Sequence, residues 1–293
     1  MKNNFFYQVA GHRFRLSFSN ESLEEDSLTN YAPFRVSKEI GDCLFSLSIV
    51  DNLSDELDYK QVGQFDNDIA FIGVFKPDNG SFRFRIAYPG SRDYCTMDTD
   101  AAFRVAQVKL PAGDKYRFFC LNNCLMLLYA FSTANLDTLM MHASVIKNET
   151  DGFIFLGKSG TGKSTHSRLW LDYIEGSELL NDDNPVVRII DGNPIVYGTP
   201  WSGKTPCYRN EKALLKGIVK LEQAPQNQIK ALSLLQAYAI VFPACSSMRW
   251  EEEIASGVHR TVEKLVSTVP CYRLYCLPDK AAAELSATTI KGA

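Results

Sequence analysis

The chain has 293 residues, 45% of them hydrophobic and 22% charged, so it can bury a full core as one large domain or two modest ones. Its formal net charge of −3 gives no electrostatic signal for nucleic acid or an anionic membrane. No apolar run approaches the ~20 residues of a membrane span, and the first eight residues do not contain the apolar core of a signal peptide. We therefore expect a cytoplasmic protein.

The cysteines agree with a reducing compartment, because they are scattered along the chain and form no Cys-x-x-Cys pair. We interpret them as free thiols, most of them buried as small hydrophobic side chains. A structural zinc site is the alternative. The eight positions are Cys43, Cys95, Cys120, Cys124, Cys207, Cys245, Cys271 and Cys276.

Residues 1–118 contain several short stretches in which apolar and polar residues alternate, a pattern typical of strands. The clearest pair, 69–75 and 81–88, flanks a Pro-Asp-Asn-Gly turn and predicts a hairpin. His12 lies in another such stretch, and we expect it on the strand surface. No motif in this region indicates chemistry, so we predict a β-rich N-terminal domain that serves acceptor recognition or assembly into a homo-oligomer.

The hydrophobic period changes over residues 119–137, which we predict to be a mostly buried connecting helix. Residues 138–293 then alternate strands and helices. The overall class is α/β (α+β when the whole chain is counted), with a mixed-sheet, phosphate-binding core over 138–293. Within it, residues 186–190 and 195–197 flank an Asp-Gly-Asn-Pro turn and predict a second hairpin.

A glycine-rich loop is the strongest signal in the chain, because it matches the phosphate-binding pattern G-x-x-x-x-G-K-[ST]. An apolar strand is predicted before it, over 152–156, and a helix after it, over 165–174. Glycines let successive backbone N–H groups turn toward one anion, and the helix N-terminus adds its own N–H groups. The loop residues are Gly157, Lys158, Ser159, Gly160, Thr161, Gly162, Lys163, Ser164 and Thr165. We expect Lys163 to reach the β- and γ-phosphates of a bound nucleotide and Ser164 to ligate Mg²⁺.

Two adjacent carboxylates, Asp182 and Asp183, end the short strand predicted before Pro185. Ligands of α/β sheets collect at such strand ends, so one carboxylate could ligate Mg²⁺ while the other accepts a hydroxyl proton. The alternative is an ordinary turn, which the Asn-Asp-Asp-Asn-Pro composition also fits. His142, in an apolar strand predicted over 139–146, could contact the γ-phosphoryl group or orient a carboxylate; the alternative is a core histidine.

Three cations are candidate phosphate clamps, namely Lys204, Arg209 and Arg249, although residues of this kind are more often ordinary surface charges. His166 and His259 lie in predicted helices, and we expect both on the surface. No Asn-Lys-x-Asp motif is present, so guanine specificity is unsupported.

These residues together resemble the catalytic domain of HPr kinase/phosphorylase, and the loop followed by Asp-Asp is also similar to ATP-dependent phosphoenolpyruvate carboxykinase. The resemblance covers residues 138–293. It implies a shared kinase fold in which Ser164 binds Mg²⁺, Asp183 takes the acceptor proton, and His142 and Lys163 surround the transferred phosphate. It also implies a downstream metal-binding glutamate and an arginine, for which Glu211 and Arg249 are the candidates.

The sequence thus predicts an ATP- and Mg²⁺-dependent kinase, with Asp183, His142 and Lys163 as catalytic residues and Ser164 and Asp182 as metal ligands. The acceptor would be a hydroxyl on a protein, a peptide or a small metabolite. The alternative is a nucleotide-binding regulatory or interaction protein that keeps the loop without phosphoryl transfer. Neither hypothesis includes a nucleic-acid or membrane partner.

Overall fold

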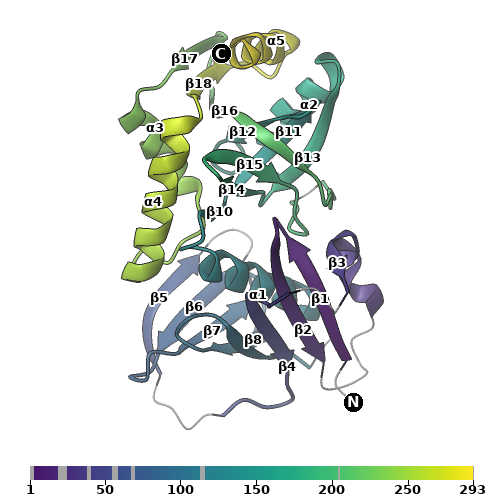
Figure 1. Cartoon of the computed structure of the whole chain (residues 1–293), viewed down its shortest axis with the longest axis vertical. Helices are drawn as coiled ribbons and strands as arrows, with labels where there is room; N and C mark the ends of the chain where they lie inside the picture. Colours follow the sequence, from purple (N-terminus) through teal and green to yellow (C-terminus); the bar gives the residue numbers. More distant parts are fainter. Residues whose placement is uncertain are drawn as a thin grey trace. The chain divides into compact units, whose positions relative to one another are not determined.

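A computed structural model of the chain describes residues 3–18, 25–37, 41–54, 59–66, 70–112, 116–203 and 205–292. It divides into two compact units, Met1–Ser132 and Thr133–Ala293. Each unit is built on one large sheet with few helices (Figure 1), so the predicted mixed α/β class is confirmed. The functional division at residues 118 and 138 stays a prediction.

The sheet of the first unit has the strand order β3-β1-β2-β4-β9-β8-β7-β6-β5 in the part of the chain that is described. Helix α1 (Arg117–Ser132) packs against β4, β7 and β8. The predicted hairpin is present as the antiparallel pair β6–β7. The strands are β1 (Asn3–Val9), β2 (His12–Phe18), β3 (Arg35–Val36), β4 (Phe45–Ile49), β5 (Lys60–Asp66), β6 (Phe71–Lys76), β7 (Phe82–Ala87), β8 (Tyr94–Thr99) and β9 (Val105–Lys109).

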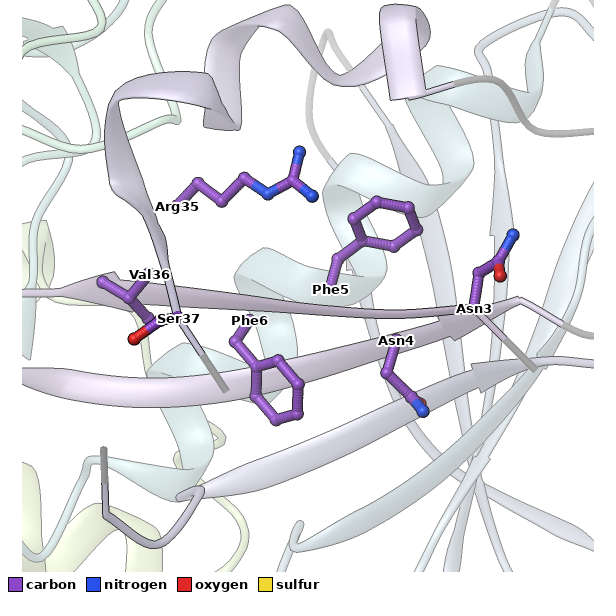
Figure 2. A pocket seen from close by; sticks show the side chains of 7 residues that line it. All are labelled: Asn3, Asn4, Phe5, Phe6, Arg35, Val36 and Ser37. Atoms are coloured by element: carbon purple, nitrogen blue, oxygen red, sulfur yellow. The ribbon is translucent and has the colours of Figure 1, made fainter. Parts of the chain in front are cut away.

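One edge of this sheet is formed by β3, which pairs only with Phe6 and Tyr7 of β1. A cavity of 730 Å³ lies beside this edge, and Figure 2 shows the rings and side chains that line it. The Arg35 guanidinium carbon lies 5.1 Å from the centre of the Phe5 ring, a cation–π contact. This cavity belongs to the first unit and contains none of the predicted site residues.

His12 is buried, with only 8% of its surface exposed, so the prediction of a surface position is wrong. The reason is that β2 is covered on both faces, as its nearly unbroken run of buried residues shows. The imidazole ring packs edge-on against the ring of Tyr129, with the two centres 6.0 Å apart.

The cysteines are all free, as predicted, and only Cys43 and Cys276 are not fully buried. The Cys95 and Cys124 sulfur atoms are in contact at 3.7 Å without a disulfide. Among the described residues, no helix combines the length and the apolar character needed to cross a membrane.

The second unit is built on the sheet β10-β14-β15-β16-β12-β11-β13, to which β18 adds beside β16 and β17 beside β18. The predicted second hairpin is the antiparallel pair β14–β15. The strands are β10 (Thr138–Met140), β11 (Ala143–Asn148), β12 (Asp151–Leu156), β13 (Ser177–Asp183), β14 (Val186–Ile190), β15 (Asn193–Tyr197), β16 (Lys212–Gln223), β17 (Gln228–Ala231) and β18 (Cys271–Cys276). The helices are α2 (Lys163–Tyr173), α3 (Leu234–Val241), α4 (Glu252–Thr268) and α5 (Lys280–Lys291).

The core of this unit lies between one face of the sheet and the helices α2 and α5. Strands β11, β12, β16 and β18 send alternate side chains into it, as their period of two requires. The core side chains include Ile146, Phe153, Phe155, Trp170, Val219, Leu221, Tyr272, Leu274, Ala283, Ala287 and Ile290. This packing holds the strand that precedes the glycine-rich loop and the helix that follows it against each other.

His166 is part of this packing and is 3% exposed, so the prediction of a surface position is wrong. Its ring packs edge-on against Phe155, and its Nε2 lies 3.1 Å from Ser286 Oγ. The same hydroxyl accepts a hydrogen bond from Trp170 Nε1 and donates one to Ala283 O. Its only proton is therefore used, so His166 Nε2 must donate. Burial lowers the pKa of His166 from 6.5 to about 4.

We predict that His166→Gln reduces the acid sensitivity of the fold. A histidine whose folded pKa is depressed stabilises the native state above its unfolded pKa, and this contribution is lost as pH falls from 6.5 toward 4. For a shift of this size the loss is about 3 kcal/mol. Urea unfolding of both proteins at pH 7.5 and pH 4.5 measures it. Equal losses of unfolding free energy in wild type and variant would contradict the assignment.

Candidate functional site

The glycine-rich loop follows β12 directly and leads into α2, so the predicted order of strand, loop and helix is confirmed. Gly160 and Gly162 have φ angles of +78° and +108°, in the left-handed region that side chains with a Cβ disfavour. Gly162 is also the N-cap of α2. A backbone of this kind lets successive N–H groups turn toward one anion, and the N-terminus of α2 adds its own N–H groups.

Three strand ends meet beside this loop because β11 runs antiparallel to both of its neighbours, β12 and β13. The start of β11 therefore lies next to the ends of the other two strands. In register terms, Ser144 faces Phe155 on one side and Asp182 on the other. His142, just before β11, and Asp183, at the end of β13, therefore lie at the same end of the strands as the loop.

The strand predicted over 139–146 is divided at this point, which the sequence did not indicate. Its first part, β10, pairs with β14, and its second part, β11, lies between β12 and β13. Between them, the His142 backbone N–H donates to Ala244 O at 2.7 Å. The break removes His142 from the regular ladder, and 44% of its side chain is exposed.

The imidazole of His142 links a carboxylate to the loop lysine. Its Nδ1 lies 3.0 Å from Asp183 Oδ1, and its Nε2 lies 2.9 Å from Lys163 Nζ. An ammonium can only donate, so Nε2 accepts from Lys163 and Nδ1–H donates to Asp183. Lys163 also donates to Gly157 O at 3.0 Å. Burial lowers the Lys163 pKa, while Asp183 and Asp182 oppose that shift.

A second pair joins the first residue after this lysine to the other carboxylate. Ser164 Oγ lies 3.0 and 3.2 Å from the two carboxylate oxygens of Asp182. Asp182 is 6% exposed, and its backbone oxygen accepts from Gly203 N at 2.8 Å. A hydroxyl and a carboxylate at this separation are hard oxygen ligands that suit Mg²⁺. Among the described residues no group of three His, Cys, Asp or Glu side chains could hold a metal ion by itself.

The two asparagines that flank the carboxylates hold Asp183 in place, a role that sequence reasoning missed. Asn184 Nδ2 donates to Asp183 Oδ2 at 2.8 Å. Asn181 is fully buried; its Oδ1 accepts from Asp183 N, and its Nδ2 donates to Thr199 Oγ1. The turn-like composition of Asn-Asp-Asp-Asn was visible in the sequence. The sequence did not show that Asn181 contacts the loop containing Thr199. This contact distinguishes the segment from a simple turn.

A cavity of 750 Å³ opens beside the loop on the side where α2, β16 and β18 converge. Its volume is in the range of pockets that hold drug-sized ligands. Gln223 reaches over it, with its Nε2 3.4 Å from Thr161 O. The lining is mainly apolar and includes Leu169, Leu221, Ala224, Cys276, Leu277 and Pro278, together with loop and α2 residues such as Gly160, Thr161, Gly162 and Thr165.

The other candidate residues do not join the His142–Asp183 pair. Glu211 lies 2.6 Å from Lys147 Nζ, and Arg209 pairs with Glu178, near the start of β13 rather than its end. Arg249 is exposed and stacks on the Phe242 ring, 5.2 Å from its centre. His259 is half-buried and stacked on the same ring rather than on the surface as predicted. Lys204 lies outside the described residues.

No protein-family model matches the chain, and no curated protein matches it. Among solved structures, the HPr(Ser) kinase/phosphatase from Coxiella burnetii is similar to part of the chain, at 12% sequence identity and a TM-score of 0.33. The match covers 52% of this chain and 88% of that one.

We predict that Gly198→Ala destabilises the fold at the loop that contacts Asn181, beside the two carboxylates. Gly198 is buried at the start of the loop that carries Thr199, and a Cβ there would come within 2.1 Å of Arg209 O and 3.0 Å of Leu180 O. Both are backbone atoms that cannot rotate away, so the free energy of unfolding should fall by about 1–3 kcal/mol. Denaturant titration measures this loss.

Gly217→Ala in β16 is the matched control, because its added Cβ would meet only side-chain carbons, none closer than 3.4 Å. It should cost clearly less than Gly198→Ala. Equal losses for the two variants would contradict the packing described for Gly198.

Proposed function

We propose that the chain is an ATP- and Mg²⁺-dependent kinase that transfers the γ-phosphoryl group to a hydroxyl on a protein, a peptide or a small metabolite. We further propose that its second unit has an HPr-kinase-like fold. The observation that carries the proposal is the chain of hydrogen bonds from Asp183 through His142 to Lys163. It connects a carboxylate able to accept a proton with the lysine of a phosphate-binding loop.

In this mechanism the loop and Lys163 hold the β- and γ-phosphates, and the acceptor hydroxyl approaches from the Asp183 side. The hydroxyl oxygen forms a bond to the γ-phosphorus, the bond between that phosphorus and the β,γ-bridging oxygen breaks, and ADP leaves. The hydroxyl proton passes to Asp183. His142 is a positioning residue: its Nδ1–H holds one carboxylate oxygen, while Asn184 holds the other.

Mg²⁺ would be held by Ser164 and Asp182, whose oxygens already lie within 3.0 Å of each other. When bound, the ion would neutralise charge on the phosphates. Two protein ligands are enough for this role, because Mg²⁺ usually completes its shell with phosphate oxygens and waters. ATP is the proposed donor, and the 750 Å³ cavity beside the loop supplies an apolar space of suitable size for its base.

The alternative function is that of a nucleotide-binding regulatory or interaction protein without transfer. One observation favours it: within the described residues, no arginine contacts the His142–Asp183 pair or the Ser164–Asp182 pair. Phosphoryl transfer commonly uses such a cation to stabilise its transition state. The two functions share nucleotide binding and differ in what Asp183 does.

We predict that Lys163→Ala removes most of the thermal stabilisation by Mg·ATP, because the lysine supplies the main cationic contact to the β- and γ-phosphates. Lys212→Ala, an exposed lysine at the start of β16, is the matched control and should respond to nucleotide like wild type. Differential scanning fluorimetry with and without Mg·ATP is the measurement. A normal nucleotide shift in Lys163→Ala would show that the loop is not the binding site.

We predict that Asp183→Asn keeps nucleotide binding but lowers phosphoryl transfer by about three orders of magnitude, since general-base catalysis contributes a factor of this size. Transfer from γ-labelled ATP into a cell extract and its metabolite fraction provides the assay and reveals the acceptor. Equal transfer by wild type and variant would exclude Asp183 as the base. Nucleotide binding with no transfer by wild type into any fraction would favour the regulatory alternative.

A further inference from the structure

Cations are aligned across three neighbouring strands on the face of the second sheet opposite α2 and α5. In β16 and β18 the residues that enter the core are Val219, Leu221, Tyr272 and Leu274, so the residues between them point to the other face. The register places Lys220 beside Arg273 and Arg273 beside Lys230 of β17. Three positive side chains therefore stand in one cross-strand row, about 10 Å long at the usual strand spacing.

This row ends at the glycine-rich loop. Lys220 is level with Leu156, the last residue of β12. It lines a cavity of 450 Å³ together with four residues of the glycine-rich loop, Lys158, Ser159, Gly160 and Thr161. The cavity lies on the β16 side of β12, whereas His142 and Asp183 reach the loop from β11 on the other side. Among the described residues, Lys220, Arg273 and Lys230 form no hydrogen bond or ion pair with the His142–Asp183 or Ser164–Asp182 pair, although Lys220 is close enough to the loop to lower the pKa of Lys163.

The charges of the row are poorly compensated. Glu222 is the one carboxylate that pairs with it in the described chain, and it lies 3.4 Å from Arg273. The ammonium groups of Lys158 and Lys220 form no hydrogen bond or ion pair with any described residue, and Arg273 Nε is buried without a partner there. Burial lowers the pKa of Lys220; Lys158 and Arg273 lower it further, against the effect of Glu222.

Like charges placed directly across a sheet destabilise it. Lys230 is exposed and lies over the Tyr275 ring, 5.7 Å from its centre. An anion that neutralises the three cations and the fourth on the loop would still stabilise the fold. Lysine ammonium groups bind phosphate as point charges, and the cavity volume suits a small molecule rather than a chain.

We propose that Lys158, Lys220, Arg273 and Lys230 form a second anion site for a small phosphate-bearing molecule, which binds beside the nucleotide and not in its place. Lys220, Arg273 and Lys230 take no part in the proposed transfer step, but Lys158 belongs to the glycine-rich loop, so the statement that the anion binds beside a nucleotide rests on the proposed function. Its occupancy would act on the loop through Lys158 and could thereby regulate nucleotide binding.

The test uses inorganic phosphate as the probe and the full chain saturated with Mg and the non-hydrolysable analogue AMP-PNP, so that the nucleotide phosphates already fill the loop. Thermal unfolding is followed during phosphate titration at constant ionic strength, with chloride as the balancing anion. We expect phosphate to raise the melting temperature of wild type further. In Lys220→Met we expect phosphate to bind about tenfold more weakly, the loss expected for one charge-assisted contact.

Lys216→Met is the matched control, since Lys216 is an exposed lysine of the same strand, about 13 Å before Lys220. It should keep the wild-type phosphate response, and Lys230→Met should weaken that response. AMP-PNP affinity should be unchanged in all three variants.

Three results would overturn the proposal. They are a phosphate response that persists in Lys220→Met, displacement of AMP-PNP by phosphate, and an AMP-PNP affinity that falls in Lys220→Met as much as phosphate affinity does. The last would assign the row to the nucleotide itself. If wild type does not bind AMP-PNP, the kinase proposal fails, and the same titration without nucleotide, in the Lys163→Ala background, still tests the second site.

Discussion

The antiparallel placement of β11 between β12 and β13 is the constraint on which the whole site depends. It sets the beginning of one strand beside the ends of two others. Residues from three separate segments of the chain therefore meet at one end of these strands. The hydrogen bonds of His142 to Lys163 and to Asp183 are possible only in this register. If β11 slipped by one residue, its side chains would exchange faces, and the packing of Ile146 in the core would be lost together with the site.

The site is also held from outside the strands. Asn181 is buried and connects the carboxylates to the loop that begins at Gly198, while Ser144 and Ser167 join β11 to α2 through a 2.7 Å contact between their hydroxyl groups. Burying polar side chains of this kind costs little free energy of folding when each one has a hydrogen-bond partner, and much more when one is left unpaired. The carboxylates themselves are held directly: His142 and Asn184 each hold one oxygen of Asp183, and Ser164 contacts both oxygens of Asp182.

Several features of this arrangement could be predicted from local sequence. The strand, glycine loop and helix around Lys163 follow from residues that are adjacent in the chain, as do the hairpins β6–β7 and β14–β15. The histidines show where such reasoning fails. For His12 and His166 the sequence pattern predicts surface positions, and both predictions are wrong. Both are buried because a second element covers the apparently polar face, α1 in the case of the Tyr129 contact and α5 in the case of Ser286.

By itself, the sequence determined that a glycine-rich loop lies between a buried strand and a helix, and that a carboxylate pair ends another strand. These are local properties, set by glycine conformational freedom and by the period of apolar residues. Only the tertiary structure decided that His142 bridges Lys163 and Asp183, that Glu211 is engaged by Lys147 instead, and that Lys220, Arg273 and Lys230 stand in one row. Those relations depend on strand order and register, which arise from the packing of the entire sheet and are not encoded in any single segment.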